Sequence, residues 1–83
     1  MVITTKFFAA FRDIIGADSL DLNIDQQHVT VNTIIRQLEQ QHPAFEGRLT
    51  KIALIAVNEV YAQHQQELQP EDVVAFFPPV SGG

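Results

Sequence analysis

The residues best suited to chemistry form the C-terminal segment Phe76-Phe77-Pro78-Pro79-Val80-Ser81-Gly82-Gly83. The two prolines lack an N–H and have a fixed φ, so they end a strand and favour an extended path. Glycine has no Cβ, so Gly82 and Gly83 would fit a channel too narrow for other residues. Fully extended, the segment from Pro78 to Gly83 spans on the order of 20 Å. We therefore expect this tail to present the α-carboxylate of Gly83 to another protein.

Other candidate groups for chemistry are weak. His28, His42 and His64 are too scattered for metal-ligand spacing, and Ser81 has no Gly-x-Ser-x-Gly context. The chain has no cysteine, which excludes disulfides, thiolate metal sites and thiol catalysis. It also has no glycine loop of the phosphate-binding type, so ATP must be bound elsewhere. We expect no metal, no cofactor and no complete active site on this chain alone.

Composition limits the class of protein. Eighty-three residues make one small domain, and a hydrophobic fraction of 46% is ample for a core. The net charge of −5, without a basic stripe, argues against nucleic-acid binding. No apolar run is long enough for a bilayer span or a signal peptide. We expect a cytoplasmic protein with a folded domain at 1–77, an extended tail at 78–83, and no membrane partner.

The residue pattern predicts one long helix. Four apolar residues recur at the i, i+3, i+4, i+7 spacing of a helix face, namely Val31, Ile34, Ile35 and Leu38. Thr30 is a suitable N-cap, and Pro43 should end the helix near His42. A shorter helical turn is expected at 11–15, ended by Gly16.

Alternating or continuous apolar runs predict five strands, at 2–9, 19–24, 51–57, 60–62 and 73–77. In the first strand, Ile3, Thr5 and Phe7 should face the core, which leaves Phe8 on the opposite face with Lys6. Residues 43–50 are expected to form a loop, with Phe45 against the core. The strand at 51–57 reads as an interior strand covered on at least part of both faces.

The order of these elements predicts an α+β fold, a mixed five-stranded sheet with one main helix packed on one face. This layout resembles the ubiquitin-like β-grasp fold. The resemblance implies that the first and last strands lie side by side in the centre of the sheet, with a free C-terminus.

The C-terminal segment resembles the signature of the small, sulfur-carrying subunit of molybdopterin synthase. Lys6-Phe7-Phe8-Ala9, Arg12, Gly16 and Ala56-Val57-Asn58 also match that family. The resemblance implies that a ubiquitin-activating-type adenylyltransferase adenylates Gly83 with Mg-ATP. A persulfide donor then displaces AMP and leaves a thiocarboxylate. Within the large subunit of the synthase, the sulfur is transferred to cyclic pyranopterin monophosphate to form the dithiolene of molybdopterin.

The same resemblance assigns roles to individual residues. Gly83 reacts, Gly82 gives passage, Pro78 and Pro79 hold the tail extended, and Val80 and Ser81 contact the channel wall. Partner contacts are implied at Phe8, Tyr61 and Phe77. Phe8 and Phe77 share a parity on neighbouring strands, so both should lie on the sheet face away from the helix. The chain would act enzymatically only within the complex, a heterotetramer in this family.

Two other functions use the same tail. A sulfur carrier for another pathway, thiazole synthesis or tRNA thiolation, would load Gly83 in the same way. A protein modifier would instead join Gly83 to lysines by an isopeptide bond. Exposed aromatics scattered without function, and a frayed Gly-Gly terminus, are the structural alternatives to any of these functions.

Overall fold

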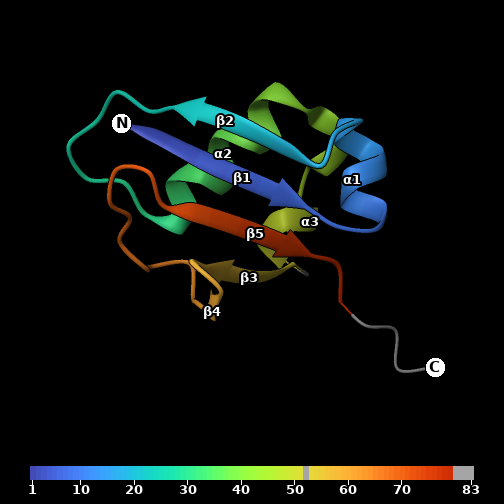
Figure 1. Ribbon diagram of the computed structural model, residues 1–83. Coiled ribbons are helices and arrows are strands. Elements are labelled where there is room, and N and C mark those ends of the chain that lie inside the picture. Colours follow the sequence, from blue (N-terminus) through green and yellow to red (C-terminus); the bar gives the residue numbers. More distant parts are fainter. Residues whose placement is uncertain (52, 80–83) are drawn as a thin grey trace.

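The fold is a single mixed sheet with helices on one face (Figure 1). The computed structural model describes residues 1–51 and 53–79. The strands are β1 (Val2–Phe7), β2 (Ser19–Asn23), β3 (Leu54–Val57), β4 (Val60–Tyr61) and β5 (Val73–Phe77). Their order across the sheet is β2-β1-β5-β3-β4. β1 and β5 pair in parallel and the other neighbours are antiparallel. The predicted ubiquitin-like β-grasp architecture, with the first and last strands adjacent, is confirmed.

The main helix, α2 (Val31–Gln41), covers one face of the sheet. Its four predicted apolar residues are all fully buried. From the sheet, Ile3, Phe7 and Phe76 point into the same core because alternate strand residues face the same side. The Phe7 ring stacks on Phe45 at a centroid distance of 5.7 Å and on Phe76 at 5.9 Å. The expected burial of Phe45 is therefore confirmed.

The N-terminus of α2 is closed by a capping box between Thr30 and Thr33. The Thr30 hydroxyl accepts a hydrogen bond from the Thr33 N–H, and the Thr33 hydroxyl accepts one from the Thr30 N–H at 3.1 Å. The predicted cap is confirmed. Each bond satisfies a backbone donor that would otherwise have no partner in the helix. The helix ends before His42, as Pro43 predicts.

The segment between α2 and β3 was wrongly predicted. Instead of a loop, residues 43–50 contain a 3₁₀ turn, η1 (Pro43–Phe45), and most of a short helix, α3 (Arg48–Lys51). Gly47, at φ 77°, lets the chain turn between them, and Leu49 of α3 is buried in the core. Because Lys51 completes α3, the strand predicted at 51–57 begins only at Leu54.

Strand ends differ from the prediction by one or two residues. β1 ends at Phe7 because Ala9 adopts φ 52° and ψ −126°, which turns the chain into helix α1 (Ala10–Ile15). β2 ends at Asn23 and β4 at Tyr61, each one residue early. Gly16 ends α1 in the left-handed conformation, as predicted. Within the described residues, no helix has the length and apolarity needed to cross a bilayer.

Candidate functional site

The sheet face turned away from α2, called the outer face below, carries the predicted docking residues. The strand register places Lys6 of β1, Ala75 of β5, Ala56 of β3 and Tyr61 of β4 in one row across the sheet. Residues in one row of neighbouring strands project from the same face. The sheet thus brings together side chains from distant parts of the chain.

Phe8 and Phe77 lie against each other beside this row. Their ring centroids are 4.5 Å apart and the ring planes differ by 12°. The prediction that both residues lie on the outer face is confirmed. Phe8 is 40% exposed and Phe77 is half-buried, so the stack still offers apolar surface to a partner. Tyr61 is 76% exposed on the same face. We call Phe8, Tyr61 and Phe77 the aromatic patch.

Sequence reasoning missed Leu54 as a member of the outer face. Leu54 pairs with Phe77 in the sheet and is 44% exposed. The strand predicted at 51–57 is apolar from residue 52 to residue 57. Such a continuous apolar run does not distinguish an exposed side chain, such as that of Leu54, from a buried one. The parity of Leu54 with Ala56 is the signal that places it on the outer face, because residues two apart in a strand share a face.

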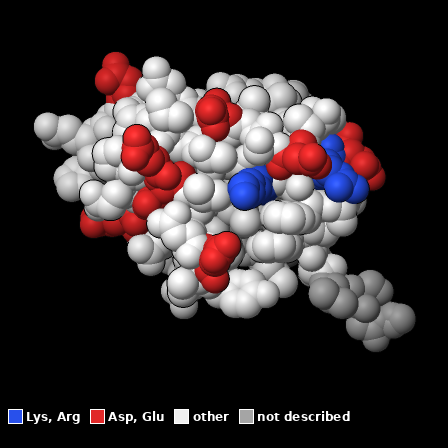
Figure 2. Space-filling view, in the orientation of Figure 1, with Lys and Arg blue, Asp and Glu red and all other residues white. Residues whose placement is uncertain are grey.

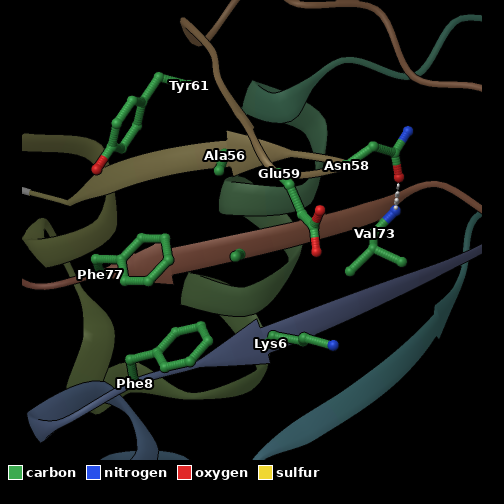
Figure 3. Close-up of a pocket in the computed structure, with 9 residues that line it drawn as sticks. Lys6, Phe8, Ala56, Asn58, Glu59, Tyr61, Val73 and Phe77 are labelled. Atoms are coloured by element: carbon green, nitrogen blue, oxygen red, sulfur yellow. Dashed lines mark hydrogen bonds between the residues drawn. The ribbon is translucent and has the colours of Figure 1, made fainter.

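A shallow groove of about 610 Å³ runs over the outer face (Figure 3). Its floor includes Ala56 and Ala75, which pair with each other across β3 and β5. Because an alanine side chain ends at Cβ, this pair leaves a hollow between larger neighbours. The larger lining side chains are those of Lys6, Phe8, Glu59, Tyr61 and Phe77.

The hairpin turn between β3 and β4 places Glu59 and Tyr61 at this groove. Asn58 and Glu59 have φ values of 49° and 72°, as a two-residue type I′ turn requires. The Asn58 side chain ties the turn to the start of β5. Its Oδ1 accepts a hydrogen bond from the Val73 N–H at 3.0 Å (Figure 3). Its Nδ2 donates one to Asp72 Oδ1 at 2.9 Å. The backbone N–H of Asn58 also donates to the Val73 carbonyl at 2.8 Å.

Acidic side chains are more numerous than basic ones on the outer face, in keeping with the net charge of −5 (Figure 2). Lys6 and Glu59 are the charged residues that line the groove. Among residues 1–51 and 53–79, the salt bridge within 4.0 Å joins Arg12 to Asp18 and involves neither of them. Those same residues contain no cluster of His, Cys, Asp or Glu suited to a metal ion.

The proline segment follows directly from the aromatic patch. β5 ends at Phe77, and the next residues are half-buried Pro78 and exposed Pro79, outside the sheet. The predicted end of the strand at these prolines is confirmed. The roles assigned to Val80, Ser81, Gly82 and Gly83 fall outside the described residues and stay predictions. The roles of Pro78 and Pro79 in the tail, and partner binding by the aromatic patch, also stay predictions.

Comparison with known proteins identifies the family. The model of the ThiS family matches residues 5–83, nearly the whole chain. The chain belongs to the ThiS family. Among its relatives is the molybdopterin synthase sulfur carrier subunit of Dictyostelium discoideum, 33% identical over 92% of this chain and 90% of that protein.

Other relatives of this ThiS-family chain have a different name. Small archaeal modifier protein 3 of Haloferax volcanii is 29% identical over the full length of both chains. The crystal structure of SAMP1 from Haloferax volcanii superposes with a TM-score of 0.86 at 27% identity, covering both chains fully. For this chain, the family and the carrier-subunit relatives support the coarse function of a small ubiquitin-like sulfur carrier. The relatives differ in name, so they leave the pathway open.

Proposed function

We propose that this ThiS-family chain carries sulfur for molybdenum cofactor biosynthesis as the small subunit of a molybdopterin synthase. The observation that carries the proposal is the position of the Phe8–Phe77 stack, at the point where β5 leads into Pro78. A partner that binds the aromatic patch there would receive the tail at a defined site. The relatives named as carrier subunits of this synthase support the same pathway.

Loading would begin with activation of the Gly83 carboxylate. A carboxylate is a poor electrophile because it is anionic and resonance-stabilised. Its oxygen attacks the α-phosphorus of Mg-ATP on a ubiquitin-activating-type adenylyltransferase, and pyrophosphate leaves. The terminal sulfur of a persulfide donor then attacks the carbonyl carbon and displaces AMP. A second thiol of the donor system cleaves the resulting acyl disulfide, which yields the Gly83 thiocarboxylate and a disulfide on the donor side.

Transfer would take place in the large subunit. The thiocarboxylate sulfur attacks a carbon of cyclic pyranopterin monophosphate and forms a C–S bond. The C–O bond at that carbon breaks, and its oxygen leaves with the phosphate group or as water. Water then hydrolyses the thioester link, which leaves sulfur on the pterin and restores the Gly83 carboxylate. A dithiolene contains two sulfurs, so each molybdopterin consumes two loaded carriers. In the proposed cytoplasmic heterotetramer, the large subunits supply the cations and general acids.

The contribution of this chain is binding and presentation. The aromatic patch, Phe8, Tyr61 and Phe77, would bind the large subunit through apolar contact. Pro78 and Pro79 would keep the tail extended, because proline restricts both its own φ and the residue before it. Val80 and Ser81 would contact the wall of the channel, and Gly82 and Gly83 would pass its narrowest part.

A substitution in the aromatic patch tests the proposal. Phe77→Ala should weaken binding to the large subunit about tenfold or more, because buried aromatic residues are frequent binding hot spots. Val2→Ala is the matched control, since Val2 is also exposed, at 45%, and does not line the groove. Affinity is measured by calorimetry, and circular dichroism checks the fold. Equal affinity of the Phe77→Ala variant and the wild type would count against the proposal.

Protein modification is the second candidate function, favoured by the full-length similarity to Small archaeal modifier protein 3. In that case Gly83 forms an isopeptide bond with a lysine of a target. Intact-mass analysis after incubation with activating enzyme, ATP and sulfur donor separates the two. Exchange of one oxygen for sulfur supports a carrier, whereas covalent adducts on other proteins support the modifier. Binding to the large synthase subunit then separates this pathway from thiazole synthesis or tRNA thiolation.

A further inference from the structure

Glu59 occupies a turn position that favours glycine. Its φ of 72° lies in the left-handed region, where a side chain is disfavoured. In two-residue type I′ turns the preferred pair is Asn-Gly, and here the pair is Asn58-Glu59. The chain therefore keeps a carboxylate at a position where glycine would be more stable. Backbone strain of this kind is concentrated at functional sites.

The Glu59 side chain is directed at the groove. It extends from the hairpin turn across β5 toward the β1 side, whereas Lys6 runs along β1 away from Phe8 (Figure 3). The two charges thus lie toward one end of the groove, and the aromatic patch lies toward the other. Neither charge belongs to the Arg12–Asp18 salt bridge found among residues 1–51 and 53–79. Both are available to a ligand on this face.

We infer that Glu59 and Lys6 form a two-point charge recognition site for the large synthase subunit, with Glu59 as the specificity-determining residue. The occupant is a segment of that subunit with a basic side chain over Glu59 and an acidic one over Lys6. The stem of the basic side chain would lie over the Ala56–Ala75 floor. This inference rests on the proposed function, and it adds the orientation of the partner.

Charge complementarity is the reason for this choice of occupant. An apolar patch alone attracts any apolar surface, but two opposite charges beside it reject a segment with the reversed arrangement. The charges of Lys6 and Glu59 sum to zero, so they contribute little to the long-range electrostatic steering of the partner. They act mainly once the two proteins are in contact. In this interpretation, the backbone strain at Glu59 makes the chain less stable, and the Glu59 carboxylate makes its binding to the partner more specific.

Glu71 provides a matched control for Glu59. It is also an exposed glutamate with a φ of 72°, it lies in a turn, and it does not line the groove. Glu59→Gly and Glu71→Gly remove the same charge and relieve the same backbone strain. Both variants should therefore melt at a higher temperature than the wild type. Only Glu59→Gly should bind the large subunit more weakly, about tenfold, as expected for loss of a close interfacial charge pair.

A charge swap tests the orientation. The double variant Lys6→Glu/Glu59→Lys keeps the net charge of −5 but reverses the two charges. It should bind the large subunit at least as weakly as Glu59→Gly, because both charges of the partner then face like charges. If the double variant bound the large subunit with wild-type affinity, Lys6 and Glu59 would interact with each other and not with charges of the partner. That result would overturn the inference.

The binding titrations use the purified large subunit with the full chain, and each outcome has a separate meaning. Wild-type binding with equal affinities for Glu59→Gly and Glu71→Gly overturns this inference and leaves the proposed function standing. Absence of wild-type binding overturns the proposed function, and the occupant named here with it. The two-point site is supported if Glu59→Gly loses affinity for the large subunit, Glu71→Gly does not, and the double variant Lys6→Glu/Glu59→Lys does not regain that affinity.

Discussion

The Asn58–Asp72 hydrogen bond offers the sharpest test of how the groove is built. Asn58→Asp keeps the side-chain shape, tolerates the left-handed conformation and retains an oxygen for the Val73 N–H. It replaces the donor Nδ2, which lies 2.9 Å from Asp72 Oδ1, by a second carboxylate oxygen. The other oxygen of Asp72 is already occupied, because Oδ2 accepts from the Gln69 N–H at 2.8 Å. Two carboxylates then face each other at hydrogen-bond distance.

The expected cost follows from these contacts. Loss of a hydrogen bond to a charged group lowers the free energy of unfolding by about 1.5–3 kcal/mol. Repulsion between the two carboxylates adds roughly 1 kcal/mol, a value near the aqueous limit because Asn58 is exposed. The total of about 2.5–4 kcal/mol corresponds to a decrease in Tm of about 10–30 °C for a domain of this size.

The double variant Asn58→Asp/Asp72→Asn should restore the network. The amide introduced at position 72 would donate from its nitrogen to the new carboxylate at position 58 and accept the Gln69 N–H with its oxygen. Each single variant leaves one mismatched contact, whereas the double variant leaves none. Urea unfolding followed by circular dichroism gives all four free energies. Recovery to within about 1 kcal/mol of the wild type is expected, and additive losses would refute the reasoning.

Three further predictions concern single positions. Ala9→Gly should raise the free energy of unfolding by about 1 kcal/mol, because φ 52° with ψ −126° strains alanine; an unchanged or lower value in urea unfolding would contradict this. Thr30→Ala should lower it by about 1 kcal/mol through loss of the capping box, whereas a Tm equal to that of the wild type would refute the cap. Leu54→Ala should weaken binding to the large subunit while changing stability little, since Leu54 is 44% exposed; a large decrease in Tm without loss of affinity would instead assign it to the core.

The sequence predicted the parts of the fold that follow from local periodicity. The α2 face was readable because Val31, Ile34, Ile35 and Leu38 recur at helical spacing, and the cap because Thr30 precedes them. The pairing of β1 with β5 was readable only through the resemblance to the β-grasp fold, since parallel pairing leaves no local signal.

The segment after α2 could not be read in the same way. An apolar run such as residues 52–57 fits either a strand or the end of a helix. Only tertiary packing decides at which residue the helix ends and the strand begins. α3 forms because Leu49 fits the core beside α2, which is a contact distant in sequence. The same ambiguity hid Leu54.

The sequence predicted which residues form the aromatic patch, but it did not predict how their rings are arranged. Strand parity places Phe8 and Phe77 on one face, but the 4.5 Å stack depends on the register of β1 and β5. The conformations of Ala9, Glu59 and Glu71 were not predictable, because nothing in those residue types favours a positive φ.

A single-turnover experiment tests the central claim most directly. The chain is first loaded by its activating enzyme, Mg-ATP and a persulfide donor, then purified and mixed with the large subunit and cyclic pyranopterin monophosphate. Intact-mass measurement should show the Gly83 thiocarboxylate return to the carboxylate while molybdopterin accumulates at one molecule per two carriers consumed. A loaded chain that keeps its sulfur in the presence of both, or molybdopterin formed equally well by a variant without Gly82 and Gly83, would contradict it.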